Sequence, residues 1–285
     1  MTEVASEEIS VEARDGFQLA GTMFRAQDSR GRVVVVNSAT GAPRHFYRHF
    51  AAALSEAGYT AVTYDYRGIG DSRPESLRGF EARMREWGLL DMAGMVDWAA
   101  GEVGAERIFL VGHSVGGQVA GMLDNPELVD GMVTFSAQSG YWRLQGGLQK
   151  LPVAFHVHVT LPLLSRLVGY MPWSWVGQGL DLPKGVALEW ARWCRNPLYL
   201  LGDDSLPLDR YRQFRAPILA HSFTDDNWGT RRAVKAMMEA YPNVVELRHV
   251  NPRDKGLESI GHFGYFRPAT SSLWRETFDW LDGQR

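Results

Sequence analysis

The length, composition and charge of the chain limit what it can be. Its 285 residues, 45% of them hydrophobic and 22% charged, are ordinary for a soluble globular protein and suit one α/β domain with an inserted segment. The formal charge of −3 excludes the basic footprint of a nucleic-acid-binding protein. The single cysteine, Cys194, cannot form an internal disulfide, which indicates a reducing compartment.

No targeting or membrane-spanning segment is expected. The first ten residues are acidic and lack the basic and apolar regions of a secretory signal. The most apolar stretch, residues 151–176, contains three prolines, two histidines and Arg166. A membrane-spanning helix rarely holds so many polar and helix-breaking residues, so this stretch is not predicted to cross a membrane.

The first third of the chain alternates between strands and helices. Residues 9–13 and 17–24 predict two antiparallel strands, because Asp15-Gly16 is a hairpin signal between them. The four valines of residues 32–36 predict a strand buried on both faces. A helix over 45–57, a strand over 60–64 and a helix over 80–101 follow.

A strand then meets a helix at a serine. Residues 108–111 form an apolar run typical of a buried strand, and residues 115–123 carry small and apolar residues at helical spacing. Between them, Gly112-His113-Ser114-Val115-Gly116 fits G-x-S-x-G, in which the serine sits on a sharp strand-to-helix turn with its hydroxyl exposed. The N–H of Val115 would open the helix and could bind an oxyanion.

The alternation is later interrupted and then resumes. After a strand at 132–136, it stops until a strand at 217–223, a helix at 231–240, a strand at 244–250 and a helix at 271–282. This order predicts a mostly parallel, doubly wound sheet with antiparallel N-terminal strands, and a site at the carboxyl ends of its strands.

The interruption predicts a helical cap. Residues 138–215 hold half of the ten tryptophans, and their place in the chain puts them above the carboxyl edge of the sheet, where they could line an apolar pocket. We therefore expect a core of residues 1–137 and 216–285 and a cap of residues 138–215. The alternative is that the aromatic residues form only the small core of the cap itself.

A serine nucleophile needs a base and an acid, which follow it in the order serine, acid, histidine. Of the eight histidines, His262 follows a loop beyond the last strand and precedes the final helix, and this makes it the candidate base. His249 lies within a predicted strand and is less suited. The strand at 217–223 ends in Asp225-Asp226; one of the two should hold His262, and the residues alone do not separate them.

A second oxyanion donor is expected from the loop after the strand at 32–36. Ala39 is the first candidate and Thr40 the alternative, while Gly41 lets the chain turn. His156 and His158 lack a nearby cysteine or carboxylate that would complete a metal set. We therefore expect no metal and no organic cofactor.

With these motifs in place, the chain resembles the α/β-hydrolase superfamily over nearly its whole length. In that family the loop after the first long buried strand is usually His-Gly-x, and Asn37-Ser38-Ala39 stands there in this chain. The resemblance also implies Asp226 as the acid, because the family's acid commonly lies nine residues after the proline that opens its strand, here Pro217. The segment 65–72 is similar to the family's structural D-x-R-G-x-G-x-S turn.

A narrower resemblance rests on four segments: 139–142, 188–195, 222–226 and 261–267. They look like a bacterial group known mainly as predicted α/β hydrolases, similar to serine-aminopeptidase-like and monoacylglycerol-lipase-like enzymes. This resemblance implies a bacterial, cytoplasmic protein.

The sequence therefore predicts a serine hydrolase that cleaves small-molecule esters of small or medium apolar acyl groups. Ser114 would attack, His262 would take its proton, Asp226 would orient His262, and Ala39 and Val115 would bind the oxyanion. An acyltransferase or peptidase with the same triad is the first alternative. A non-catalytic ligand-binding protein and a cofactor-free peroxidase or oxygenase are further alternatives.

Overall fold

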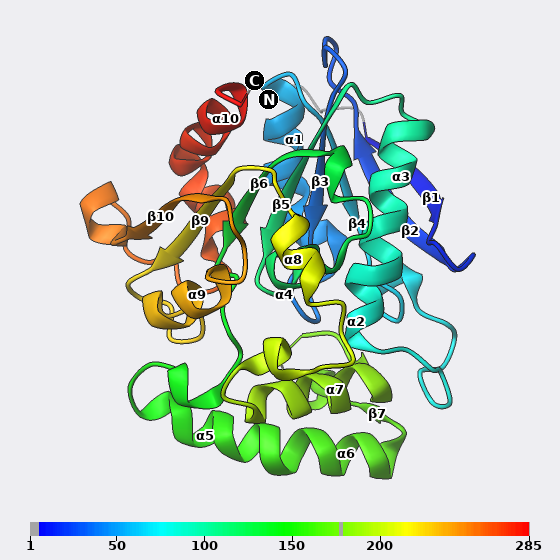
Figure 1. Ribbon diagram of the computed structural model, residues 1–285, viewed down its shortest axis with the longest axis vertical. Helices are drawn as coiled ribbons and strands as arrows, with labels where there is room; N and C mark the ends of the chain where they lie inside the picture. Colours follow the sequence, from blue (N-terminus) through cyan, green and yellow to red (C-terminus); the bar gives the residue numbers. More distant parts are fainter. Residues whose placement is uncertain (1–5, 177–178, 285) are drawn as a thin grey trace.

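The centre of the molecule is an eight-stranded sheet (Figure 1). The structure is a computed structural model and describes residues 6–176 and 179–284. Across the sheet the strands run in the order β1-β2-β4-β3-β5-β6-β9-β10. β1 pairs antiparallel with β2 and β2 with β4, and all the other neighbours are parallel. This arrangement confirms the predicted mostly parallel sheet with antiparallel N-terminal strands.

The predicted strands of the sheet all form, with ends that differ by up to three residues. Their bounds are β1 Ser6–Glu12, β2 Gln18–Phe24, β3 Arg32–Asn37, β4 Thr60–Tyr64, β5 Arg107–His113, β6 Val129–Phe135, β9 Ile218–Phe223 and β10 Val244–Val250.

Both faces of the sheet are covered by helices, which explains the run of valines in β3. Val33 and Val35 belong to one buried cluster, and Val34 and Val36 to another on the opposite face. Alternate side chains of a strand point to opposite faces, so a strand covered on both sides needs apolar residues throughout. The helices that cover the sheet are α1 Arg48–Glu56 and α10 Trp274–Asp282 on one face and α3 Ala93–Gly101 and α9 Arg231–Met238 on the other.

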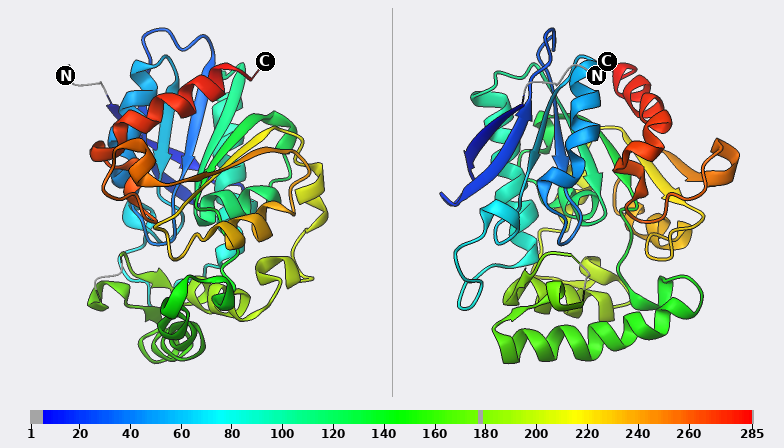
Figure 2. Two further views of the ribbon diagram at one scale, coloured as in Figure 1. Left: turned by 90° about the vertical axis from the view of Figure 1, so that its left-hand side faces the viewer. Right: turned by 180° about the vertical axis from the view of Figure 1, so that it is seen from behind.

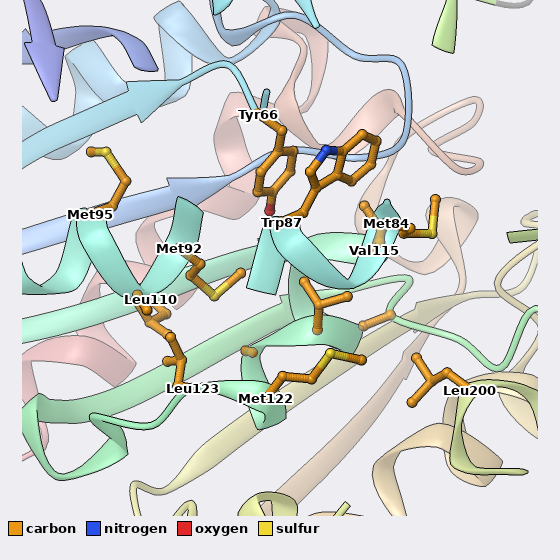
Figure 3. Close-up of a cluster of buried hydrophobic side chains, with 14 of the residues drawn as sticks. Tyr66, Met84, Trp87, Met92, Met95, Leu110, Val115, Met122, Leu123 and Leu200 are labelled. Atoms are coloured by element: carbon orange, nitrogen blue, oxygen red, sulfur yellow. The ribbon is translucent and has the colours of Figure 1, made fainter. Parts of the chain in front are cut away.

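The cluster beneath α3 is rich in methionine and aromatic side chains (Figure 3). Trp87 stacks on Tyr66 with ring centroids 4.8 Å apart and an interplanar angle of 7°. Met92 and Leu110 lie in the same cluster, as does Val115, the residue that follows the elbow serine. The turn that carries Ser114 is therefore anchored in the largest apolar cluster described in the molecule.

Helix ends differ more from the predictions than strand ends do. The helix predicted over 80–101 begins at Met84, where the Glu86 carboxylate accepts the backbone N–H of Arg83 at 3.0 Å. It then passes through a π-helical segment, Trp87–Met92, before α3. The helix predicted over 115–123 is only α4, Val115–Gln118, followed by a 3-10 turn, Val119–Met122. Three glycines in this stretch lower its helix propensity.

The chain order creates a crevice at the carboxyl ends of the central strands. From β3 the chain crosses to β4 on one side and then returns to β5 on the other side of β3. In open parallel sheets, ligands bind outside the carboxyl ends of the strands at such a switch point. The loops after β3 and β5 carry Ala39 and Ser114, respectively.

A helical insertion connects β6 to β9. Its larger part, residues 142–176 and 179–195, lies beyond the carboxyl ends of the sheet, whereas residues 209–213 pack alongside the sheet against the turn that follows α4 (Figures 1 and 2). The elements of the insertion are α5 Lys150–Phe155, a π-helical segment His156–Thr160, α6 Leu161–Val168, the two-stranded pair β7 Tyr170–Met171 and β8 Leu182–Pro183, α7 Lys184–Arg195 and α8 Asp209–Gln213. The division into a core of residues 1–137 and 216–285 and a cap of residues 138–215 stays a prediction.

Candidate active site

Ser114 occupies a strained turn between β5 and α4. Its backbone has φ 52° and ψ −116°, a conformation that non-glycine residues rarely adopt. A Cβ at Gly112 would lie 2.6 Å from the Cα of Gly117, and one at Gly116 would collide with the carbonyl of Asn37. The glycines are therefore needed because β3, β5 and α4 approach one another closely here.

Val115 is the first residue of α4. The first N–H groups of a helix have no partner within the helix, and they carry the positive end of its dipole. The N–H groups of Gly117 and Gln118 both donate to the Ser114 carbonyl. Because Val115 directly follows Ser114 and begins the helix, its N–H lies beside the serine at the positive end of the helix dipole.

Asp226 is a buried carboxylate, 4% exposed, that accepts four hydrogen bonds. Its Oδ1 accepts the N–H groups of Trp228 and Gly229, each at 2.8 Å, and its Oδ2 accepts Ser136 Oγ at 2.6 Å and His262 Nδ1 at 2.8 Å. Burial alone would raise the pKa of Asp226, but the charge of His262 and these hydrogen bonds outweigh it and bring the pKa to about 2. The carboxylate is therefore ionised at neutral pH.

The bond to Asp226 fixes the tautomer of His262. An ionised carboxylate only accepts hydrogen bonds, so Nδ1 of a neutral His262 carries the proton and Nε2 is free to accept one. Asp225 does not contact the ring. Its Oδ2 accepts the N–H groups of Ile260 and Gly261, at 2.8 and 3.0 Å, and so holds the loop that leads to His262.

Ser114 and His262 line the same pocket, which has a volume of about 90 Å³. The insertion contributes Trp173 and Trp190 to its wall. The complete lining is Ala39, Thr40, Ser114, Gln138, Trp173, Trp190, Trp228, His262 and Phe263. The pocket therefore combines an aromatic wall with four polar residues, two of which are the serine and the histidine.

Gln138 is a polar side chain of this pocket that the sequence analysis did not single out. It is 4% exposed, and its Oε1 has no hydrogen-bond partner among the described residues. A buried amide without a partner is costly unless a ligand or water satisfies it. Among residues 6–176 and 179–284, no group of three or more His, Cys, Asp or Glu side chains is arranged to hold a metal ion.

The loop after β3 does not present Ala39 as predicted. The Ala39 N–H donates to Tyr47 Oη at 2.8 Å, so this group is engaged inside the protein. Ala42 N donates to the Ala39 carbonyl, and Gly41 has φ 71°, which makes residues 39–42 a type II turn. In this turn Thr40 lines the pocket, and its N–H makes no hydrogen bond to any residue described. Thr40, the alternative donor, is the better placed of the two.

A chain of hydrogen bonds joins this loop to His262. Tyr47 Oη lies 2.8 Å from His113 Nδ1, and His113 Nε2 lies 2.8 Å from the carbonyl oxygen of His262. Burial lowers the pKa of His113 to about 3, so the ring is neutral. The carbonyl can only accept, so Nε2 carries the proton and Tyr47 donates to Nδ1. The sequence analysis missed this role of His113, since it depends on a tyrosine from another element.

His249 and Cys194 do not line the pocket, and neither does a further histidine, His221. His249 Nδ1 lies 2.9 Å from Ser222 Oγ, and His221 is buried between Phe135 and Tyr265. Cys194 is buried, and burial raises the pKa of its thiol above the usual range. Ser136 was also missed: it follows β6 with φ 51° and bonds the carboxylate of Asp226. Its position at the carboxyl end of a central strand was the available signal.

Comparison with known proteins places these features in a family. Residues 27–184, more than half of the chain, match the family model of the serine aminopeptidases, S33. Epoxide hydrolase 3 of Siraitia grosvenorii is 35% identical over 103 residues, which are 34% of this chain and 30% of that protein. The match therefore spans about a third of the length of this curated relative.

Solved structures align over nearly the whole chain. An esterase of Pyrococcus furiosus aligns over 98% of this chain and 92% of its own, with a TM-score of 0.61 and 15% identity. An epoxide hydrolase of Vigna radiata aligns over 99% of both chains, with a TM-score of 0.62 and 18% identity. At these identities the likeness concerns the fold. The family match and the shared fold together show that the chain belongs to the serine aminopeptidase (S33) family of α/β hydrolases.

Proposed function

We propose that the protein is a serine hydrolase that cleaves carboxylic esters of small acyl groups through an acyl-enzyme. The observation that carries the proposal is the hydrogen bond from His262 Nδ1 to Asp226, which leaves Nε2 as a base in the pocket that Ser114 also lines. A serine hydroxyl needs such a base, and the base needs a carboxylate to hold its tautomer and stabilise its charged form.

The reaction follows from these roles. Ser114 Oγ attacks the ester carbonyl while His262 Nε2 takes its proton, and the N–H groups of Val115 and Thr40 donate to the resulting oxyanion. The tetrahedral intermediate then expels the alcohol, which takes the proton from His262. Water attacks the acyl-enzyme, again giving its proton to His262, and the acid leaves as Ser114 regains its hydrogen. No cofactor is required for these steps.

The nucleophile favours acyl substrates over epoxides, although epoxide hydrolases share the fold. If Ser114 opened an epoxide, the product would be an alkyl ether of the serine. Water cannot displace such an ether as it displaces an acyl group, so turnover would stop after one cycle. An acyl-serine is an ester and is hydrolysed by the chemistry that formed it.

The pocket favours an uncharged ester over a peptide with a free, charged amino terminus. An aminopeptidase must bind the ammonium group at the N-terminus of its substrate, and a buried ammonium needs a carboxylate partner. Among the described residues that line the pocket there is no Asp or Glu. The tryptophans of the wall suit an apolar acyl group, and the unpaired amide of Gln138 suits a polar atom beside the scissile bond.

The volume of the pocket favours a small acyl group. A cavity of about 150 Å³ holds a benzene molecule, and this pocket has a volume of about 90 Å³. We therefore expect acetyl and butyryl esters to be better substrates than octanoyl esters.

Kinetics of Ser114→Ala on p-nitrophenyl acetate, butyrate and octanoate test the proposal. Loss of a triad serine is expected to lower kcat by about 10⁴-fold or more. Asp226→Asn should lose about 10⁴-fold because His262 would take the wrong tautomer, whereas Asp225→Asn, which affects only the loop, should lose far less. A fluorophosphonate should label Ser114 stoichiometrically. Full activity of Ser114→Ala would refute the mechanism, and faster turnover of aminoacyl p-nitroanilides than of esters would refute the substrate class.

A further inference from the structure

The helix Lys150–Val168 carries two rows of side chains at a spacing of four residues. One row is buried, and the other consists of large apolar side chains between 40% and 73% exposed. The buried row is Val153, Val157, Leu161 and Ser165, and the exposed row is Leu151, Phe155, Val159, Leu163 and Leu167. We call this segment the outer helix, because it lies at the end of the molecule farthest from the sheet (Figures 1 and 2).

The π-helical segment His156–Thr160 lies in the middle of the outer helix and keeps the two rows in line. In a regular α-helix, positions four residues apart drift by about 40° around the axis, so five of them would spread over about 160°. The wider π turns reduce this drift. The exposed apolar row is therefore one continuous face along the helix.

The charge around this face is positive. The sequence has no Asp or Glu between Asp130 and Asp181, while Arg143, Lys150 and Arg166 lie in that interval. Residues 138–208, the part of the insertion that precedes α8, contain six Lys and Arg and four Asp and Glu, a charge of +2 in a chain whose total is −3. An apolar helical face with basic residues and none of the opposite sign is typical of helices that lie on an anionic lipid surface.

We propose that the outer helix docks the protein on the surface of a lipid bilayer with anionic headgroups, with its axis in the plane of the bilayer. This contact is separate from the proposed reaction and does not depend on it. By length and composition the outer helix could also cross a membrane. Crossing would pull its buried row away from the neighbouring α7, against which α6 packs, so the surface position preserves the fold.

A second copy of the chain is the less suitable occupant. The commonest dimers have two-fold symmetry, in which the same patch meets itself. The basic residues of one outer helix, Lys150 and Arg166, would then lie near the same basic set of the partner, and the outer helix contains no acidic residue to pair with them. An anionic bilayer instead supplies the opposite charge to every basic residue at once.

The outer helix also contacts the wall of the pocket. Trp173 Nε1 donates to His156 Nε2 at 3.2 Å, and the two rings stack with an interplanar angle of 12°. Trp173 lines the pocket that contains Ser114. When the outer helix is docked on lipid, only the side chain of Trp173 would therefore separate it from the substrate pocket. An apolar ester dissolved in the bilayer would approach the pocket from this same end of the molecule.

Flotation with vesicles tests the proposal, using the full chain and two lipid compositions. The wild-type protein should float with vesicles of phosphatidylcholine and phosphatidylglycerol, bind less to vesicles of phosphatidylcholine alone, and dissociate as NaCl is raised. The variant Phe155→Ser/Leu163→Ser/Leu167→Ser should bind the anionic vesicles at least about tenfold more weakly. Lys150→Glu/Arg166→Glu should lose the preference for anionic lipid.

Matched controls separate docking from folding and from catalysis. Leu198→Ser/Val245→Ser changes two side chains that are 65% and 58% exposed but lie off the outer helix, and Arg275→Glu changes an exposed arginine of α10. Both should bind like wild type. All variants should keep wild-type activity on soluble p-nitrophenyl acetate. If the proposed function is wrong, wild type and variants alike will lack this activity, while the results of vesicle binding will be unaffected. The proposal is overturned if wild type stays unbound at saturating lipid, or if the triple serine variant floats as well as wild type. It is also overturned if wild type forms a dimer that this variant abolishes and no vesicles are bound.

Discussion

The turn at Thr40 and Gly41 offers a test of a single backbone N–H group. Type II turns favour proline at their second position, which Thr40 occupies. Thr40→Pro should therefore keep the turn and remove only its N–H. If this group binds the oxyanion, kcat should fall by about 10²–10³-fold with little change in KM for p-nitrophenyl acetate.

Thr40→Ala is the matched control, because it removes the side chain and keeps the N–H. It should have nearly wild-type kcat, and both variants should unfold at the wild-type temperature. Equal kcat values for Thr40→Pro and wild type would exclude Thr40 as a donor. The loop would then have to turn Ala39 away from Tyr47 during the reaction.

The parts of the site that could be predicted are those with a local signature. Ser114 stands in a short motif whose glycines are dictated by close backbone contacts, and His262 follows from the order of elements along the chain. Ser136 and Tyr47 could not be predicted in this way. Their roles depend on partners 90 and 66 residues away, Asp226 and His113, and no local pattern marks such pairs.

At the scale of elements, a buried ion-pair network attaches the insertion to α2, Met84–Glu86. Arg85 donates from its backbone N and its Nε to the carboxylate of Glu189 in α7, at 2.9 and 2.7 Å. Its guanidinium also contacts Asp203, which in addition accepts Arg192 and Trp193 Nε1. Burial opposes ionisation of Asp203, but the hydrogen bonds from Ser205 and Trp193 and the charge of Arg192 lower its pKa to about 2. The network therefore holds α7, and with it Trp190, against the helix that begins at Met84.

We expect Arg85→Met to loosen this attachment. Removing one partner of a buried ion pair leaves charge without compensation and costs about 3–5 kcal/mol, and Arg192 offsets part of that cost here. Hydrogen exchange should speed up in α7 and stay unchanged in β5 and β6. KM for the ester should rise more than kcat falls, because Trp190 forms part of the pocket wall.

The exposed pair of Arg275 and Asp279 in α10 provides the comparison, since surface ion pairs contribute little. Arg275→Met should leave exchange in α7 and both kinetic constants unchanged. If Arg85→Met behaved in the same way, the network would have no part in holding the insertion.

The parts of the fold that could be predicted are the strands buried on both faces, because burial there requires apolar residues. A strand covered on both faces must be apolar throughout, so β3, β4 and β5 could be located from composition alone. Helix interiors were predicted less well. The π-helical segments Trp87–Met92 and His156–Thr160 depend on how neighbouring elements pack, and a period of 3.6 residues does not reveal them.

For the whole molecule, charge is divided between two regions. Residues 138–208 carry +2 while the chain as a whole carries −3, so the rest of the chain carries −5 and the two regions differ in sign. Near an anionic surface, as in the docking proposed above, this division would favour the orientation in which residues 138–208 face the surface. Figure 2 shows the outer helix at the end of the molecule that such an orientation would present.

Buried titratable groups make the stability of the whole molecule depend on pH. Burial lowers the pKa of His113 and of His221 to about 3, well below the value of about 6.5 in an unfolded chain. Between these values the unfolded chain binds protons that the folded protein does not, so the free energy of unfolding falls as the pH falls. Asp91 acts in the opposite sense, because burial raises its pKa to about 7. Asp226, with a pKa of about 2, acts only below about pH 4.

Burial also lowers the pKa values of His156 and His249, so the histidines together outweigh Asp91 and the unfolding protein takes up protons between about pH 6.5 and 4. The free energy of unfolding, measured by urea denaturation, should therefore fall as the pH falls through this range. His221→Phe keeps a ring between Phe135 and Tyr265 and removes one of these histidines, so its slope should be smaller than that of wild type by about 1.4 kcal/mol per pH unit. His249→Phe, at a position that is only partly buried, should keep most of the wild-type slope. A slope that is the same in wild type and His221→Phe would mean that His221 is not held neutral by burial.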